Sequence, residues 1–186
     1  MNGYFKRQLA DYVEYHRDPW NCAMHVFGII FLFLAAVLPL STWTLHGFGI
    51  QTSAAIILVV PVLIYWLLLD SALGIAIVGA AALLLSAAAI IDHHVSAVGM
   101  WLTTGVLIVI GFALQAVGHQ LFERRQPALL DNPPHLLIGP MFVMAKLFIA
   151  SGFRHDLAAI IQAPQQASRR APFYAGEPQG EAQPRS

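Results

Sequence analysis

The sequence PWNCAMHVFGIIFLFLAAVLPL, residues 19–40, contains no Asp, Glu, Lys or Arg and is long enough to cross a bilayer as one helix. Three more apolar runs follow it, at about Ser53–Leu69, Ser71–Ile91 and Val98–Phe122. A chain inside a bilayer must satisfy its backbone hydrogen bonds internally, so runs of this kind predict transmembrane helices. The sequence therefore predicts an all-α, polytopic membrane protein with about four transmembrane helices.

Composition agrees with this class of protein. The chain has 186 residues, of which 58% are hydrophobic and 11% charged, whereas a soluble domain carries roughly 25% charged residues. Its one cysteine, Cys22, excludes an internal disulfide and a cysteine-based metal cage, so a metal site would need His and carboxylate ligands. The formal net charge is zero and there is no basic stripe, which argues against nucleic acid as a partner.

Two helix boundaries can be located from local signals. Residues 1–17 are polar and Tyr-rich and no small-residue cleavage site follows them, so we expect a retained amphipathic helix. Asp18 is a suitable N-cap and Pro19 a natural first helical position, which predicts that a new helix begins there. At Asp70 the second and third apolar runs meet, and this aspartate is expected to cap a tight helical hairpin.

The C-terminal third of the chain is less regular. Four prolines within residues 124–140 rule out one regular helix over that stretch: Pro127, Pro133, Pro134 and Pro140. Residues 135–150 are nevertheless too apolar for a free loop, and they predict a re-entrant or interfacial helix. From residue 163 onward Gln, Pro, Ala, Arg and Gly dominate. We therefore expect one membrane-embedded domain over residues 1–162 and a disordered cytoplasmic tail over residues 163–186.

Charge predicts the orientation of the bundle. Positive side chains lie before the first span and after the last one: Lys6, Arg7, Arg17, Arg124 and Arg125. The loops expected around His46 and around His93 and His94 contain no Lys or Arg. The positive-inside rule therefore predicts that both termini are cytoplasmic. The start of the first span, the turn at Asp70 and the end of the fourth span would then share the cytoplasmic face.

Ionisable side chains gather on that face. Such groups are costly at membrane depth and by default mark a functional site. Residues four apart share a face of a helix, and three pairs have this spacing: Tyr12 with His16, Asn21 with His25, and His119 with Glu123. Three imidazoles and one carboxylate, with Asp70 and His135 near them, suit a non-haem Fe(II) site. Zinc would accept the same ligands.

Two longer motifs contain these residues. The first is Tyr12-x-x-x-His16-x-x-x-x-Asn21-x-x-x-His25-x-x-Gly28, and the second is QAVGHQLFERRQPALLDN at residues 115–132, followed by Gly-Pro-Met-Phe at residues 139–142. Together they closely resemble the signature of the fungal-type 2-hydroxy fatty acid dioxygenase family. Members of that family resemble small multi-span membrane enzymes that use Fe(II) and dioxygen to shorten 2-hydroxy fatty acids by one carbon, in α-oxidation.

The resemblance implies roles for individual residues. His16, His25 and His119 become candidate iron ligands, with Glu123 as a fourth ligand or as a base beside the metal. Further side chains are candidates for orienting the ligands or holding the substrate: Tyr12, Asn21, Asp70, Asp131 and His135. The 2-hydroxy acid is expected to chelate iron through its hydroxyl and carboxylate, with its tail among the spans and membrane lipid around it.

One position departs from the family pattern, because Lys146 stands where an acidic residue is expected. This lysine would either pair with a substrate carboxylate or direct its ammonium to lipid headgroups. The resemblance places the protein in the endoplasmic reticulum if its host is eukaryotic, and in the inner membrane if the host is bacterial.

Two other functions are compatible with the same residues. Pairs of histidines on facing helices can hold a haem for electron transfer. Alternatively, the polar cluster would bind an ion or lock the helices together in a structural or transport protein without catalysis. An intense Soret band would favour the first alternative, and an absence of bound transition metal the second.

Overall fold

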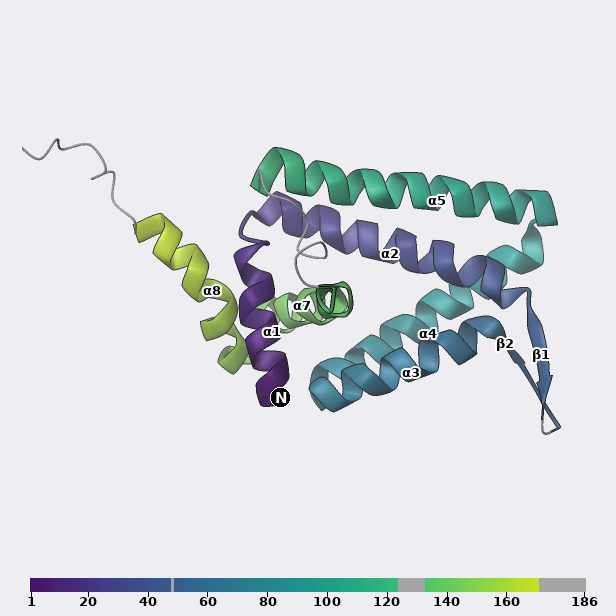
Figure 1. Ribbon diagram of the computed structural model, residues 1–186, viewed down its shortest axis with the longest axis horizontal. Coiled ribbons are helices and arrows are strands. Elements are labelled where there is room, and N and C mark those ends of the chain that lie inside the picture. Colours follow the sequence, from purple (N-terminus) through teal and green to yellow (C-terminus); the bar gives the residue numbers. More distant parts are fainter. Residues whose placement is uncertain (48, 124–132, 171–186) are drawn as a thin grey trace, which may run out of the picture.

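In the part of the chain that the structure describes, the protein is all-α apart from one short β hairpin (Figure 1). The computed structural model describes residues 1–47, 49–123 and 133–170. Along the chain the elements are α1 (Gly3–Glu14), α2 (Pro19–Ser41), β1 (Thr44–Gly47), β2 (Ile50–Ser53), α3 (Ala54–Leu69), α4 (Ser71–His94), α5 (Ala97–Val117), the π-helix η1 (Gly118–Glu123), α7 (His135–Ala150) and α8 (His155–Arg170).

Side-chain caps fix where the helices begin. The Asp18 carboxylate accepts hydrogen bonds from the backbone amides of Trp20 and Asn21, and Pro19 occupies the first turn of α2. Asp70 ends α3 and caps α4 by accepting from the amide of Leu73. Both predicted boundaries are confirmed, because a carboxylate satisfies amides that the first turn of a helix leaves without intrahelical partners.

Among the described residues, three helices are long and apolar enough to cross a membrane: α2, α4 and the continuous helix Ala97–Phe122. A fourth span is possible if α7 and α8, which meet at a bend of 116°, together form one broken span. The predicted second span, α3, is a helix of 16 residues, which is about 24 Å at 1.5 Å per residue. Since a hydrocarbon core is about 30 Å thick, α3 falls short of the length expected of a span.

The long helices pack in pairs, with α2 antiparallel to α5 and α3 antiparallel to α4 (Figure 1). Glycine permits the close approach of α2 and α5. A Cβ added to Gly111 would lie 2.7 Å from Leu32 Cγ and 3.3 Å from the Gly28 carbonyl oxygen. The backbones therefore touch where these two glycines meet.

The turns at the far end of the bundle differ from the prediction. His46 was expected in a loop but lies in β1, which pairs antiparallel with β2. His93 and His94 were also expected in a loop, but α4 continues through both of them. The paired strands satisfy each other's backbone groups. In α4, His94 Nδ1 lies 2.8 Å from the carbonyl oxygen of Ile90 one turn earlier. Regular secondary structure therefore extends beyond the ends of the apolar runs.

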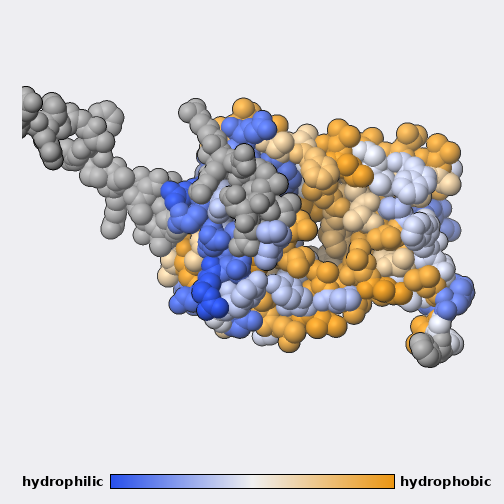
Figure 2. All heavy atoms as spheres, in the orientation of Figure 1, coloured by the Kyte–Doolittle hydropathy of each residue, from blue (hydrophilic) through white to orange (hydrophobic). Residues whose placement is uncertain are grey.

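The surface has an apolar middle and two polar ends. Hydrophobic residues cover the long helices, while hydrophilic ones gather over α1 at one end and beside the β hairpin at the other (Figure 2). Large side chains are exposed along α5: Val98, Trp101, Leu102, Val106, Val109 and Phe112. This distribution is that of a membrane protein, with α1 at one polar boundary.

The C-terminal helix crosses the predicted domain boundary. Helix α8 extends to Arg170, so eight residues of the segment expected to be a tail are helical. Residues 171–186 lie outside the described residues. The extent of the membrane-embedded domain and the disorder of the tail therefore stay predictions.

Candidate metal centre

A break between two helices brings His16 and His25 together. Helix α1 ends at Glu14, and α2 begins at Pro19 under its Asp18 cap, so the chain turns sharply at His16. His25 lies between one and two turns into α2, on the same face as Asn21. The rings of His16 and His25 meet edge to face, with centroids 4.5 Å apart.

The third imidazole, His119, follows α5, which packs antiparallel to α2 and ends where α2 begins. His119 is in η1, where α5 changes from α- to π-helical hydrogen bonding. Such π-helical turns occur frequently at functional sites. An added Cβ at Gly118 would overlap Oδ1 of the buried Asn21 from α2, so a larger residue at this junction would force that side chain to move. This close contact brings η1 against the first turns of α2.

The three histidines form one compact, buried group. Their potential ligand atoms all lie within 4.8 Å of one another. The His119 ring centroid is 5.1 Å from that of His16 and 4.7 Å from that of His25. Only 1%, 6% and 2% of His16, His25 and His119 is exposed, respectively. The predicted convergence of these three side chains is therefore present in the structure.

Backbone carbonyls orient two of the rings. His16 Nδ1 lies 3.0 Å from the Tyr12 carbonyl oxygen, and His25 Nδ1 lies 3.2 Å from that of Asn21. A carbonyl only accepts hydrogen bonds, so Nδ1 donates in both rings and Nε2 keeps its lone pair. Within the described part of the chain, His16 Nε2 is buried without a hydrogen-bond partner. A nitrogen left in this way is suited to binding a metal.

The surroundings of His16 keep its ring neutral. Burial, together with the neighbouring His25, lowers the pKa of His16 to about 2. Tyr12 stacks on this ring, with centroids 4.0 Å apart and planes 6° from parallel. Burial also raises the pKa of Tyr12 far above its usual range, so the phenol stays protonated. Neutral, oriented imidazoles are the form that coordinates divalent transition metals, so His16 suits such an ion, and the potential ligand atoms of His25 and His119 lie within 4.8 Å of it and of each other.

His135 lies beside this group and has a different partner. Its Nε2 is 3.1 Å from the Asp11 carboxylate, and its ring meets the edges of Tyr12 and Tyr15. Sequence reasoning missed Asp11 because α7, which carries His135, could not be placed against α1. His135 contacts Tyr12, which stacks on His16, and therefore supports the ring that covers His16.

Phe142 also packs against the His16 ring, and the sequence analysis did not single it out. Its ring centroid is 5.1 Å from that of Tyr12 and 5.8 Å from that of His16. The only available signal was its place in the Gly-Pro-Met-Phe motif. Phe142 is 1% exposed, so α7 closes the side of the group that faces away from α5.

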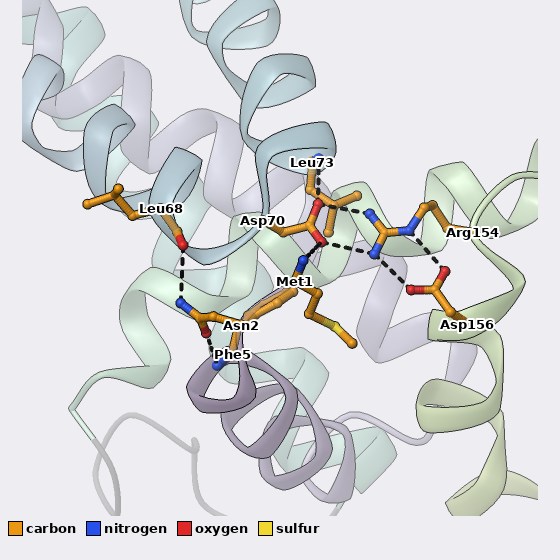
Figure 3. Close-up of polar contacts among 8 residues, drawn as sticks. All are labelled: Met1, Asn2, Phe5, Leu68, Asp70, Leu73, Arg154 and Asp156. Carbon is orange, nitrogen blue, oxygen red and sulfur yellow. Dashed lines mark hydrogen bonds and ion pairs between the residues drawn. The ribbon is translucent and has the colours of Figure 1, made fainter.

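Asp70 belongs to a separate polar cluster (Figure 3). The prediction that it joins the histidines is wrong: in the described residues the potential ligands that come together are the three histidines. Asp70 instead pairs bidentately with Arg154, at 2.8 and 2.9 Å, and with the Met1 nitrogen at 3.2 Å. The Asp70 turn meets the beginning of α1, whereas the histidines lie at its end, so one helix length separates the two clusters.

Two predicted acidic residues, Glu123 and Asp131, have side chains outside the part of the chain that the structure describes. Glu123 ends η1, but its side chain lies outside the described residues. Asp131 also lies outside the described residues. Their roles stay predictions.

Known proteins match a region of the chain that contains the whole candidate centre. A family model described as "Mpo1-like: 2-hydroxy-palmitic acid dioxygenase Mpo1-like" matches residues 3–151. The chain is also 32% identical over 168 residues to the 2-hydroxy-palmitic acid dioxygenase MPO1 of Saccharomyces cerevisiae, covering 89% of this chain and 91% of the yeast protein. No solved structure gives a significant match. All three histidines lie inside the matched region.

Proposed function

The chain belongs to the family of Mpo1-like 2-hydroxy-palmitic acid dioxygenases, and from that premise we propose that it cleaves 2-hydroxy fatty acids in an Fe(II)-dependent reaction with dioxygen. The products are the acid one carbon shorter, carbon dioxide and water. One dioxygen accepts the four electrons released from C1 and C2, so the reaction balances without an external reductant.

One observation carries this proposal, namely the three buried imidazoles whose potential ligand atoms lie within 4.8 Å of one another. Fe(II) bound by His16, His25 and His119 would supply the redox chemistry that activates dioxygen. Zinc suits the same donors but has no redox chemistry, so the dioxygenase family favours iron.

The chain's other residues have supporting roles in this proposal. The carbonyl groups of Tyr12 and Asn21 hold Nδ1 of His16 and His25, which directs Nε2 into the centre. Tyr12 and Phe142 cover His16 with aromatic rings and exclude water from it. The centre lies at the polar boundary of an apolar body, where a fatty acid can present its head group while its tail stays among the helices.

The close packing of the three histidine rings argues against a haem site. The three rings already contact one another edge to face, with centroids 4.5 to 5.1 Å apart. A macrocycle would have to separate two of them. A single ion among the rings requires no such rearrangement.

Dioxygen uptake and product mass test this function. Detergent-purified protein is loaded anaerobically with Fe(II) and given 2-hydroxyhexadecanoic acid, with hexadecanoic acid as the control. Uptake with the hydroxy acid alone and formation of pentadecanoic acid are expected, and zinc-loaded protein should be inactive. Uptake with both acids, or none by protein that retains iron, would refute the proposed reaction.

The His119→Ala variant should lose turnover and iron while keeping its helical content. His94→Ala is the matched control, because His94 is exposed at the end of α4 and distant from the centre. Full turnover by the His119→Ala variant would contradict its proposed role as a ligand.

A further inference from the structure

Lys146 of α7 directs its ammonium into the protein. Its Nζ lies 2.9 Å from Sγ of Cys22 in α2 and 5.0 Å from the centroid of the Phe142 ring. A lysine at a membrane boundary usually extends its ammonium toward water or headgroups. The inward orientation of Lys146 therefore requires another explanation.

The ammonium has weak partners in this position. Among the residues that the structure describes, no carboxylate lies within ion-pair distance of Lys146. A thiol is a weak hydrogen-bond acceptor, and an aromatic ring offers only its quadrupole. A partly buried cation with such partners is poorly compensated, so the site is suited to an anion.

Both partners of Lys146 also touch the metal centre. Phe142, one turn earlier on α7, packs against the His16 ring. Cys22 Sγ lies 3.5 Å from the carbonyl oxygen of His16 and donates its hydrogen bond there. Cys22 also precedes His25 by three residues on α2, so the two share a face. An anion that replaces Cys22 as the partner of Lys146 would lie beside the histidines.

We propose that Lys146 binds the carboxylate of the fatty acid substrate and thereby selects free acids over neutral lipids. This inference rests on the proposed function and adds the residue that recognises the head group. In a 2-hydroxy acid the carboxylate is bonded directly to the carbon that bears the hydroxyl. An ion pair with Lys146 therefore brings the C1–C2 bond to the edge of the centre and leaves the alkyl tail to the apolar helices.

Equilibrium binding tests this role without turnover. Metal-free protein in detergent is titrated with radiolabelled 2-hydroxyhexadecanoic acid and, separately, with hexadecane-1,2-diol, which has the hydroxyl but no charge. The Lys146→Met variant should bind the acid about tenfold more weakly or worse, since charged hydrogen bonds contribute that much. Its affinity for the diol should be unchanged.

Two further variants separate charge from packing. Lys146→Arg keeps the charge and should bind the acid within about threefold of the unmodified protein. Lys6→Met removes the chain's other lysine, which is exposed on α1, and should have no effect. An equal loss in the Lys146→Arg and Lys146→Met variants, or an acid affinity that Lys146→Met leaves unchanged, would overturn the inference.

Steady-state kinetics distinguish this inference from the proposed function. With iron bound, the Lys146→Met variant should raise KM for the acid while kcat changes little, and its iron content should equal that of the unmodified protein. If the unmodified protein consumes no dioxygen, the proposed function fails, and the binding titration still reports on Lys146. If it is active and Lys146→Met has an unchanged KM, only the assignment of Lys146 fails.

Discussion

Replacing Asp70 by Asn should destabilise the fold without affecting the metal centre. Asp70 receives two hydrogen bonds from Arg154, lies 3.2 Å from the Met1 nitrogen and caps α4 (Figure 3). It therefore connects the turn between α3 and α4 with the beginning of α1 and with the bend before α8. Asn has the same shape but no charge, so it keeps the cap and loses the ion pairs.

The pKa of Asp70 indicates the size of the effect. Burial alone would raise this pKa, but hydrogen bonds from Arg154, the Leu73 amide and the Met1 nitrogen lower it from 3.8 to about 2. At about 1.4 kcal/mol per pKa unit, the ionised carboxylate stabilises the folded state by about 2 kcal/mol. For a chain of this length that corresponds to a decrease of about 4–8 °C in Tm.

Thermal unfolding in detergent measures this difference. Asp156→Asn is the matched control, because Asp156 pairs with the same Arg154 but is 52% exposed, against 2% for the Asp70 side chain. An exposed pair contributes about 0–1 kcal/mol, so the control should barely shift Tm. Equal shifts in the two variants, or no shift in Asp70→Asn, would refute the reasoning.

The ion pair between Asp70 and Arg154 also predicts how the stability of the fold changes in acid. Because the folded-state pKa of Asp70 is depressed, its contribution is fully present above the unfolded value of 3.8 and is lost as pH falls toward about 2. The Tm difference between the unmodified protein and Asp70→Asn should therefore be constant near neutral pH and disappear in strong acid. A difference that persists below pH 2 would show that charge is not its source.

Two packing contacts give further predictions. In Gly118→Ala the new Cβ would overlap Asn21 Oδ1, so we expect a loss of about 1–3 kcal/mol in unfolding free energy and weaker iron retention. Gly105→Ala, which meets nothing within 4 Å on α5, should be neutral or slightly stabilising, and a similar loss in both variants would contradict the clash. Trp66→Phe removes the 2.7 Å hydrogen bond from Nε1 to the Leu137 carbonyl oxygen and should cost about 1 kcal/mol. An unchanged Tm would show that this bond does not stabilise α7 on α3.

Local chemistry explains which features were predictable. Asp18 and Asp70 could be recognised as caps because the signal lies within three residues of the helix start. The convergence of His16, His25 and His119 followed from the order of the spans, since an antiparallel arrangement returns α5 to the beginning of α2. Short-range rules and chain topology were sufficient for these features.

Lateral positions were not predictable in the same way. Sharing one face of a membrane places Asp70 and the histidines at similar depth but leaves their separation undetermined, and α1 lies between them. The contact of His135 with Asp11 depends on how α7 crosses α1, which no local pattern encodes. The π-helical register at His119 is a change in backbone hydrogen bonding that no side-chain pattern in the sequence marks.

Iron content is the most direct measure of whether the three histidines bind metal. Protein loaded with Fe(II) and desalted is analysed by elemental mass spectrometry for the unmodified chain and for His16→Ala, His25→Ala and His119→Ala. His94→Ala is the control, because His94 is exposed at the end of α4 and distant from the centre. We expect about one iron per chain in the unmodified protein and in His94→Ala, and almost none in the other three variants. Iron retained by folded His16→Ala, His25→Ala and His119→Ala proteins would contradict the proposed centre.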